Sequence, residues 1–180
     1  MTRARRVRYQ VAMSLDGYIA APNGEADWIV MDDDIDFKAL FAQFDTFLVG
    51  RKTFEAMGGR AMGGGKGTKT IVFSRTLKPH DHPRVTVVAD RIAETVAALR
   101  AEKGKDIWLF GGGSLFRSLL AAGVVDTVEV AIMPVLLGAG TPLLPSPASA
   151  ATLTLTGHKV YPKTGIVLLE YAVTSADSHA

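Results

Sequence analysis

The sequence predicts an α/β protein with a mostly parallel central sheet and an antiparallel edge strand at the C-terminal end. Apolar runs of strand length alternate with segments of helical periodicity as far as Val135, and two strand-like runs then follow one another. Alternation of this kind gives parallel strands, whereas two successive strands joined by a short turn give an antiparallel pair. Two glycine-centred turns each follow an apolar run and precede a helical pattern, as strand-to-helix turns do.

Composition limits the class of protein. The chain has 180 residues, of which 48% are hydrophobic and 21% charged, so we expect one globular domain over residues 1–174 and a frayed tail over 175–180. The net charge of +2 is too small to indicate nucleic-acid binding, and the arginines crowded before Tyr9 are expected to form a solvated tail. The absence of cysteine excludes disulfides and thiolate catalysis. No apolar run reaches the roughly 20 residues of a membrane span, so we expect a cytoplasmic protein without a membrane partner.

The expected elements follow one another along the chain. The first strand ends at Leu15-Asp16-Gly17, which is a turn signal, and residues 18–28 are expected to be irregular. The strand-like runs are Val7–Ser14, Thr46–Val49, Lys69–Phe73, Val85–Val88, Ile107–Phe110, Thr127–Val135, Leu153–Val160 and Ile166–Val173. The helical patterns cover Asp32 to Phe44, Lys52–Met57, Ile92 to about Lys103, and Ser114–Ala121.

An acidic helix start and a glycine-rich stretch lie between the predicted strands. The first helix is predicted from a stripe at i, i+3, i+4 and i+7, with Asp32-Asp33-Asp34 at the end where the helix dipole favours negative charge; the stripe consists of Phe37, Leu40, Phe41 and Phe44. The stretch Gly58–Gly67 holds six glycines and is predicted to be a mobile surface loop rather than a domain linker.

The two glycine turns predict an anion-binding site. The turns are Gly50-Arg51-Lys52-Thr53 and Gly111-Gly112-Gly113-Ser114. A helix that begins at such a turn presents free N–H groups at its positive end, and two such sites suit a ligand with more than one phosphate, such as a dinucleotide. Phe116 stands where a Rossmann fingerprint requires its last glycine, so another scaffold is needed.

Two arginines at strand ends extend this pattern. Arg51 follows one predicted strand and Ser74-Arg75 follows the next, so both arginines are candidates to converge on one phosphate. The alternative is a pair of solvated arginines. His80-Asp81-His82 lies between two prolines and is expected to be a solvated loop, so we expect no metal site.

Five motifs in order resemble the dihydrofolate reductase superfamily, in the branch that includes the C-terminal reductase domain of bacterial riboflavin biosynthesis enzymes. The resemblance runs from about Val7 to Val173. The motifs are Ser14–Ala20, Gly50–Glu55, Ser74-Arg75, Phe110–Leu115 and Met133–Gly140. The resemblance implies a three-layer dihydrofolate reductase-like fold and NADPH as cofactor, with hydride transfer to a C=N or C=O carbon of a small pteridine- or aminopyrimidine-type heterocycle.

The resemblance also implies residue roles. The backbones of Ala12 and Ile19 would hold the nicotinamide carboxamide. Gly50, Arg51, Lys52 and Thr53 would bind phosphate, and Ser74 and Arg75 would face the adenosine 2′-phosphate. The second turn would border the cofactor through Leu109, Phe110, Gly111, Gly112, Gly113, Ser114 and Leu115. A homodimer is a further expectation, with Leu136-Leu137 and Leu143-Leu144 as an apolar stretch that core packing explains equally well.

Three carboxylates are candidates for the proton donor. Asp33 is the first candidate and Asp36 the second, because true dihydrofolate reductases use a carboxylate on the corresponding helix; the alternative is that these aspartates cap the helix. Asp16 is the third candidate, with a turn role as its alternative. Ala131 replaces the threonine of classical folate reductases, and no arginine-rich segment after Asp36 would grip a ribose phosphate. A 5-amino-6-(5-phosphoribosylamino)uracil reductase and an inactive NADPH-binding module therefore stay as alternatives.

Overall fold

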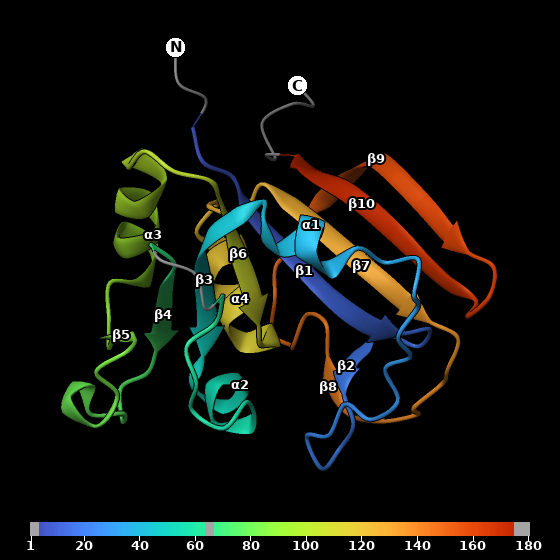
Figure 1. Cartoon of the computed structure of the whole chain (residues 1–180), viewed down its shortest axis with the longest axis horizontal. Coiled ribbons are helices and arrows are strands. Elements are labelled where there is room, and N and C mark those ends of the chain that lie inside the picture. The colour runs from blue at the N-terminus through green and yellow to red at the C-terminus, as the bar shows by residue number, and fades with distance from the viewer. Residues whose placement is uncertain (1–3, 64–66, 175–180) are drawn as a thin grey trace.

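The computed structural model describes residues 4–63 and 67–174, and its centre is a single large sheet (Figure 1). Among these residues the sheet has eight strands in the order β5-β4-β3-β6-β1-β7-β10-β9. Neighbouring strands from β5 to β7 are parallel, whereas β10 is antiparallel to both β7 and β9. The strands are β1 (Val7–Ser14), β3 (Phe44–Gly50), β4 (Lys69–Phe73), β5 (Thr86–Val88), β6 (Asp106–Gly111), β7 (Thr127–Met133), β9 (Thr152–Tyr161) and β10 (Ile166–Thr174).

This topology confirms the mostly parallel sheet with antiparallel strands at the C-terminal end. The prediction left open which of the last two strands lies outside. The C-terminal strand β10 lies next to β7, and β9 forms the edge.

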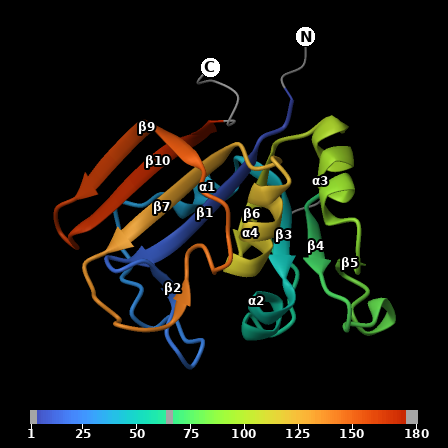
Figure 2. The same ribbon diagram turned by 180° about the vertical axis from the view of Figure 1, so that it is seen from behind.

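Helices cover both faces of the sheet, so the molecule has three layers. Figure 1 shows α1 (Phe37–Phe41) and α2 (Arg51–Ala56) in front of the sheet, and Figure 2 shows α3 (Ile92–Ala101) and α4 (Gly113–Ala121) on the opposite face. Right-handed crossovers explain this division. The connection from β3 to β4 runs toward one edge of the sheet, whereas those from β5 to β6 and from β6 to β7 run toward the other.

Alternating side chains of the central strands fill two hydrophobic cores. In β3, Leu48 faces the α3–α4 side, and its neighbours Phe47 and Val49 face the α1–α2 side. In β6, Leu109 faces the α3–α4 side and Trp108 faces the α1–α2 side. This period of two is the geometry of a strand buried on both faces. A third, smaller cluster around Met133, Tyr161 and Ile166 lies where β7 and the β9–β10 hairpin meet the segment before α1.

The predicted first helix is much shorter in the structure. It covers only Phe37–Phe41, and Phe44 begins β3 instead of ending the helix. Asp32 accepts hydrogen bonds from the N–H of Asp34 and, through its carbonyl, from the N–H of Ile35. These bonds give the backbone a turn in place of the first helical residues, as aspartate side chains often do. Phe44, which the stripe places at i+7, lies in β3. There it packs on Trp108, as Phe41 of the short helix also does.

The expectation of a solvated N-terminal tail is wrong for Arg5 and Arg8. Arg5 is 3% exposed and Arg8 is 7% exposed. Arg5 binds Asp45, the Thr46 hydroxyl and two carbonyl oxygens, and the Arg8 guanidinium binds both carboxylate oxygens of Glu129 at 2.7 Å. Charge patterning missed this because the partners lie 40 and 121 residues away in the sequence.

Smaller features complete the fold. The region expected to be irregular contains β2 (Tyr18–Ala20), which pairs with β8 (Thr141–Pro142). In the glycine-rich stretch, Met62 packs into the α1–α2 core, and its N–H donates a hydrogen bond to Thr70 Oγ1 at 2.9 Å. Residues 64–66 of the predicted mobile loop and the predicted tail over 175–180 lie outside the described residues. Among the described residues, no helix has the length and apolar character needed to cross a membrane.

Candidate active site

The two glycine turns lie at the point of the sheet where ligands bind in open α/β folds. β3 and β6 are neighbours, but β3 leads into α2 on one face and β6 leads into α4 on the other (Figures 1 and 2). Adjacent parallel strands whose chains leave to opposite faces define a topological switch point, with a crevice outside their carboxyl ends. The structure therefore brings together the two turns that the sequence separates by about 60 residues.

The turns contact one another closely. A Cβ added at Gly50 would lie 3.4 Å from the backbone nitrogen of Gly112, and one added at Gly112 would lie 3.1 Å from Thr53 Oγ1. Gly50 and Gly112 are the N-caps of α2 and α4, and neither has a side chain to cap the helix. The peptide bond between Gly111 and Gly112 is cis. The first turns of both helices therefore lie close to one another, with main-chain groups of the two glycine turns in contact.

The start of α4 is enclosed from a third direction. A Cβ at Gly113 would lie 2.8 Å from the carbonyl oxygen of Pro142 and 2.9 Å from Cδ of Pro145. The segment around β8 thus covers the first turn of α4, and glycine is the residue that permits this approach. Leu109 and Leu115 lie next to the turn, but their side chains belong to the hydrophobic core, so only their main chain can border a ligand.

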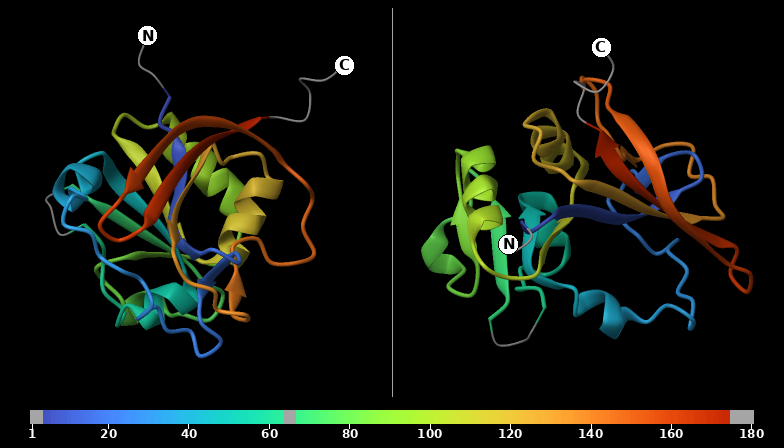
Figure 3. Two further views of the ribbon diagram at one scale, coloured as in Figure 1. Left: turned by 90° about the vertical axis from the view of Figure 1, so that its right-hand side faces the viewer. Right: turned by 90° about the horizontal axis from the view of Figure 1, so that it is seen from above.

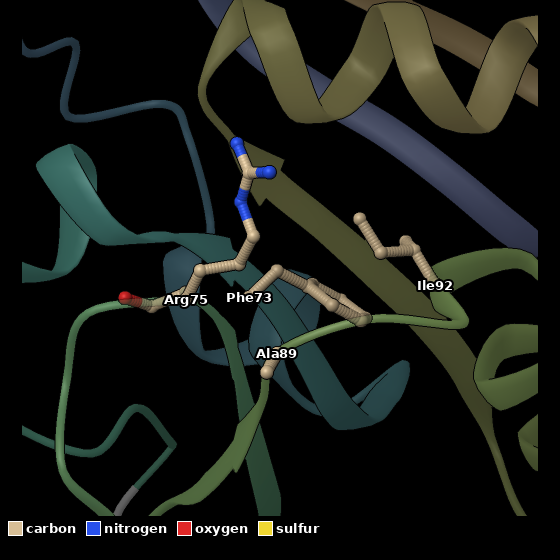
Figure 4. Close-up of a pocket in the computed structure, with 5 residues that line it drawn as sticks. Phe73, Arg75, Ala89 and Ile92 are labelled. Carbon is tan, nitrogen blue, oxygen red and sulfur yellow. The ribbon is translucent and has the colours of Figure 1, made fainter.

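The two candidate arginines follow the neighbouring strands β3 and β4, and each has its own surroundings. Arg51 lies along α2, where it forms an ion pair with Glu55 at 2.8 Å on an exposed surface. Arg75 lines a small open cavity of about 120 Å³ with Phe73, Ser74, Ala89 and Ile92. Figure 4 shows its guanidinium extending away from Ala89, on the side of the picture where α4 lies. Ser74 Oγ accepts from the N–H groups of Thr76 and Leu77, so this turn after β4 is rigidly defined.

The other end of the crevice lies over β1. Ala12 pairs with Ala131 of β7, and both belong to the third cluster together with Trp28. Ile19 lies in β2, on the short second sheet. Two buried polar atoms near this end, Trp28 Nε1 and the side-chain oxygen of Gln10, have no hydrogen-bond partner among the described residues. Such atoms are costly to bury alone, and they are available to a bound molecule.

Asp16 anchors a loop in the structure. Its carboxylate accepts hydrogen bonds from Ser14 Oγ at 2.6 Å and from the N–H groups of Leu137 and Gly138 at 3.0 and 2.7 Å. These bonds, above all the one from Ser14, lower the pKa of Asp16 from 3.8 to about 2. The ionised Asp16 carboxylate, bound by three donors, holds the loop after β7 against the β1–β2 turn. This arrangement favours a structural role of Asp16 in the turn over a role as proton donor.

The structure distinguishes among the neighbouring aspartates in a way that the sequence did not. Asp36 is the N-cap of α1 and accepts from the N–H of Ala39 at 2.8 Å, as the capping alternative predicts. Asp33 is exposed. Asp32, which we did not single out, is 3% exposed and accepts from Thr164 Oγ1 at 2.6 Å. That bond and the N–H of Asp34 lower the pKa of Asp32, so it is an ionised carboxylate beside the third cluster.

Taken together, the sheet topology, the paired glycine turns and the inward carboxylate define a dihydrofolate reductase-like fold. The chain belongs to the family of the RibD C-terminal domain, whose model matches residues 5–167. It is 34% identical to YyaP of Bacillus subtilis (strain 168), over 94% of this chain and 95% of that protein.

Solved structures agree on the fold. A protein from Shewanella sp. PV-4 named for riboflavin biosynthesis superposes with a TM-score of 0.78 at 24% identity, over 94% of this chain and 99% of that one. A dihydrofolate reductase from Enterococcus faecalis, complexed with NADP(H), superposes with a TM-score of 0.68 at 19% identity, over 94% of this chain and 97% of that one.

Proposed function

We propose that this protein is an NADPH-dependent reductase that transfers a hydride to a C=N or C=O carbon of a small pteridine- or aminopyrimidine-type heterocycle. The observation that carries the proposal is the contact between the two glycine turns, with Gly50 and Gly112 bordering one space at the switch point of the sheet. The family supports the same conclusion, because one structural neighbour is named as a pyrimidine reductase-like protein and another is complexed with NADP(H).

The residues at the crevice fit a dinucleotide. The N–H groups at the starts of α2 and α4 would bind the pyrophosphate, together with Thr53 and Ser114. Lys52 and Arg51 would add positive charge, after Arg51 exchanges Glu55 for a phosphate. Ser74 and Arg75 would hold the 2′-phosphate at the cavity beside α3. When bound, the cofactor supplies the hydride, and the protein aligns it over β1 at Ala12 and Ile19 and excludes water.

The segment before α1 would contact the substrate. Asp32 is a buried residue of the segment that contains Trp28 and Ile35, and these two residues pack on the third cluster together with Ala12. We propose that Asp32 accepts hydrogen bonds from ring or amino N–H groups of the substrate. Asp33 stays our candidate for the proton donor, because it is exposed next to Asp32 and can exchange protons with water. The unpartnered atoms of Trp28 and Gln10 would bind further polar groups of the same molecule.

Two alternatives make different predictions. A 5-amino-6-(5-phosphoribosylamino)uracil reductase would need cations for the ribose phosphate. The cations near Asp32 already have partners: Lys163 is bound to Asp34 at 3.1 Å, and Lys159 lies over the ring of Tyr161. An inactive module would bind NADPH tightly and reduce nothing.

The experiment is a two-part assay of the full chain. Fluorescence titration measures the Kd for NADPH and NADH, and a panel of dihydropteridines, pterins and aminouracils with and without a ribose phosphate is tested for NADPH oxidation. Tight NADPH binding with turnover of an unphosphorylated heterocycle supports the proposal. Turnover of the phosphoribosyl compound alone would favour the first alternative, and binding without any turnover would favour the second.

A further inference from the structure

The turn of the β9–β10 hairpin contacts the segment that carries Asp32. Figures 1 and 3 show the tip of the hairpin beside the segment that leads into α1. Thr164, in this turn, donates a hydrogen bond from Oγ1 to Oδ2 of Asp32 at 2.6 Å. Lys163, the residue before it, forms an ion pair with Asp34 at 3.1 Å. Two adjacent residues of the turn therefore bind two acidic residues of the segment, although these pairs are 132 and 129 positions apart in the sequence.

The turn itself is held firmly on the sheet. Tyr161 and Ile166 pair at the end of the hairpin and are buried in the third cluster. The N–H of Gly165 donates to the carbonyl oxygen of Tyr161 at 2.9 Å, and Gly165 has a φ of +76°, which glycine adopts without strain. A Cβ added at Gly165 would lie 3.5 Å from Cγ of Pro134, so the turn also packs against the residue that follows β7. This packing fixes the position of the Thr164 hydroxyl.

The hydrogen bonds of the Asp32 carboxylate leave capacity for a ligand. An ionised carboxylate offers about four acceptor sites on its two oxygens. Thr164 donates to Oδ2, and the N–H of Asp34 donates to Oδ1 at 2.9 Å. Among the described residues these are the donors to the Asp32 side chain, so each oxygen can accept from a further N–H group. The bond from Thr164, and then that from Asp34, lower the pKa of Asp32 and keep this buried carboxylate ionised.

The charged side chains of the hairpin act on Asp32 in a different way. Lys163 and Lys159 lower the pKa of Asp32 as nearby positive charges. Lys163 is bound to Asp34, and Lys159 lies over an aromatic ring. A hydrogen bond requires alignment of donor and acceptor, whereas a Coulomb interaction does not. Thr164 is therefore the hairpin residue whose contact fixes the direction of the carboxylate.

We infer that Thr164 is a positioning residue for the Asp32 carboxylate, so that the turn of the β9–β10 hairpin forms part of the substrate site. The hydroxyl holds Oδ2 in one orientation, and the remaining acceptor sites of the carboxylate then meet the N–H groups of the heterocycle in a fixed geometry. The inference rests on the proposed function, because that proposal assigns Asp32 to substrate binding.

Thr164→Val tests the inference, because valine keeps the shape of threonine and removes the hydroxyl. For the heterocycle that the wild type reduces, kcat/KM is expected to fall roughly ten-fold or more through a higher KM, since a hydrogen bond to a charged group is lost. The acid limb of kcat/KM against pH is expected to move up by about one unit, because Asp32 is protonated more easily without this bond. Thr164→Ser should restore both properties, and the Kd for NADPH should be unchanged in both variants.

Two further measurements separate positioning from a general structural effect. Thr154→Val is the matched control, because it removes a hydroxyl from an exposed part of the same hairpin, where Thr154 Oγ1 lies 3.2 Å from Thr174 Oγ1. It should change neither KM nor the pH profile. Carboxylate NMR follows the titration of Asp32 without turnover, and the pKa of Asp32 is expected to be higher in Thr164→Val than in the wild type. Circular dichroism confirms folding; if Thr164→Val is not folded, Thr164→Ala replaces it.

The outcomes distinguish this inference from the proposed function. Wild-type KM and an unmoved acid limb in Thr164→Val would overturn the inference and leave the reductase proposal intact. Losses in Thr164→Ser as large as those in Thr164→Val would also overturn it, because the hydroxyl would then not be the cause. If the wild type reduces no heterocycle, the proposed function fails and the NMR titration decides: a raised pKa of Asp32 in Thr164→Val supports the positioning role, and an unchanged pKa overturns it.

Discussion

The loss of Arg75 is expected to change the preference for NADPH over NADH. Arg75 lines the cavity between β4, β5 and α3, which is where the 2′-phosphate would lie. A hydrogen bond to a charged group contributes about 1.5–3 kcal/mol, which is roughly 10- to 150-fold in affinity. Because Arg75 is exposed, solvent screens the charge, and we expect the lower end of this range for Arg75→Ala. The Kd for NADH should stay within about two-fold.

Fluorescence titration with both cofactors measures this effect, and two controls sharpen it. Arg84→Ala removes one positive charge from an exposed loop that does not line the cavity, so it should change neither Kd. Raising the salt concentration from about 0.05 M to about 0.5 M should weaken the wild-type preference for NADPH and leave Arg75→Ala almost unaffected, because screening acts on the charge that the variant has lost. Equal losses for NADPH and NADH in Arg75→Ala would refute the assignment of the 2′-phosphate to this cavity.

Three further predictions concern the turns and the carboxylates. Gly112→Val is expected to abolish NADPH binding in a folded protein, because a Cβ at 3.1 Å from Thr53 Oγ1 fills the space between the turns; retained affinity in a dialysis assay would make the turn merely structural. Asp33→Asn is expected to reduce turnover by roughly 100-fold with NADPH affinity within a few-fold, whereas Asp36→Asn should be normal because asparagine caps a helix equally well. Normal turnover in both would mean that the proton comes from elsewhere, with Asp16 and bulk water as the remaining candidates. Asp16 has a depressed pKa of about 2 in the folded protein, so its stabilisation is present above pH 3.8 and is lost as the pH falls toward 2. The difference in Tm between wild type and Asp16→Asn should therefore shrink over that interval, and a constant difference would contradict the anchoring role.

Much of the fold could be predicted because its signals are local. Apolar runs at strand length and the glycines that end them are properties of neighbouring residues, so the order of elements and both turns followed from the sequence. The contact between Gly50 and Gly112 could be anticipated only through the resemblance to a family, because strand order is a property of the whole sheet.

Other features depended on partners that no local pattern reveals. Three adjacent aspartates look alike in the sequence, and the buried one is selected by Thr164, which lies 132 residues away. The β-bulge in β9, opposite Glu170 and Tyr171, also depends on a partner that the local sequence does not reveal. Leu155 and Val160 of β9 lie on one face only because the pairing of β9 with β10 shifts register between Glu170 and Tyr171.

The two ends of the sheet differ in a way that explains how an open crevice is compatible with a stable protein. At the amino ends, arginines just before β1 and at its start tie that strand to its neighbours: Arg5 binds Asp45 of β3, Arg6 binds Asp106 of β6, and Arg8 binds Glu129 of β7. A buried pair of this kind adds little net free energy, but breaking it is costly, so it fixes which strands lie side by side and in what register. At the carboxyl ends of β3 and β6, the corresponding positions carry the glycines Gly50 and Gly111. Because the register is set at one end, the glycine turns at the other end hold their close contact without bulky side chains, as the proposed dinucleotide site requires.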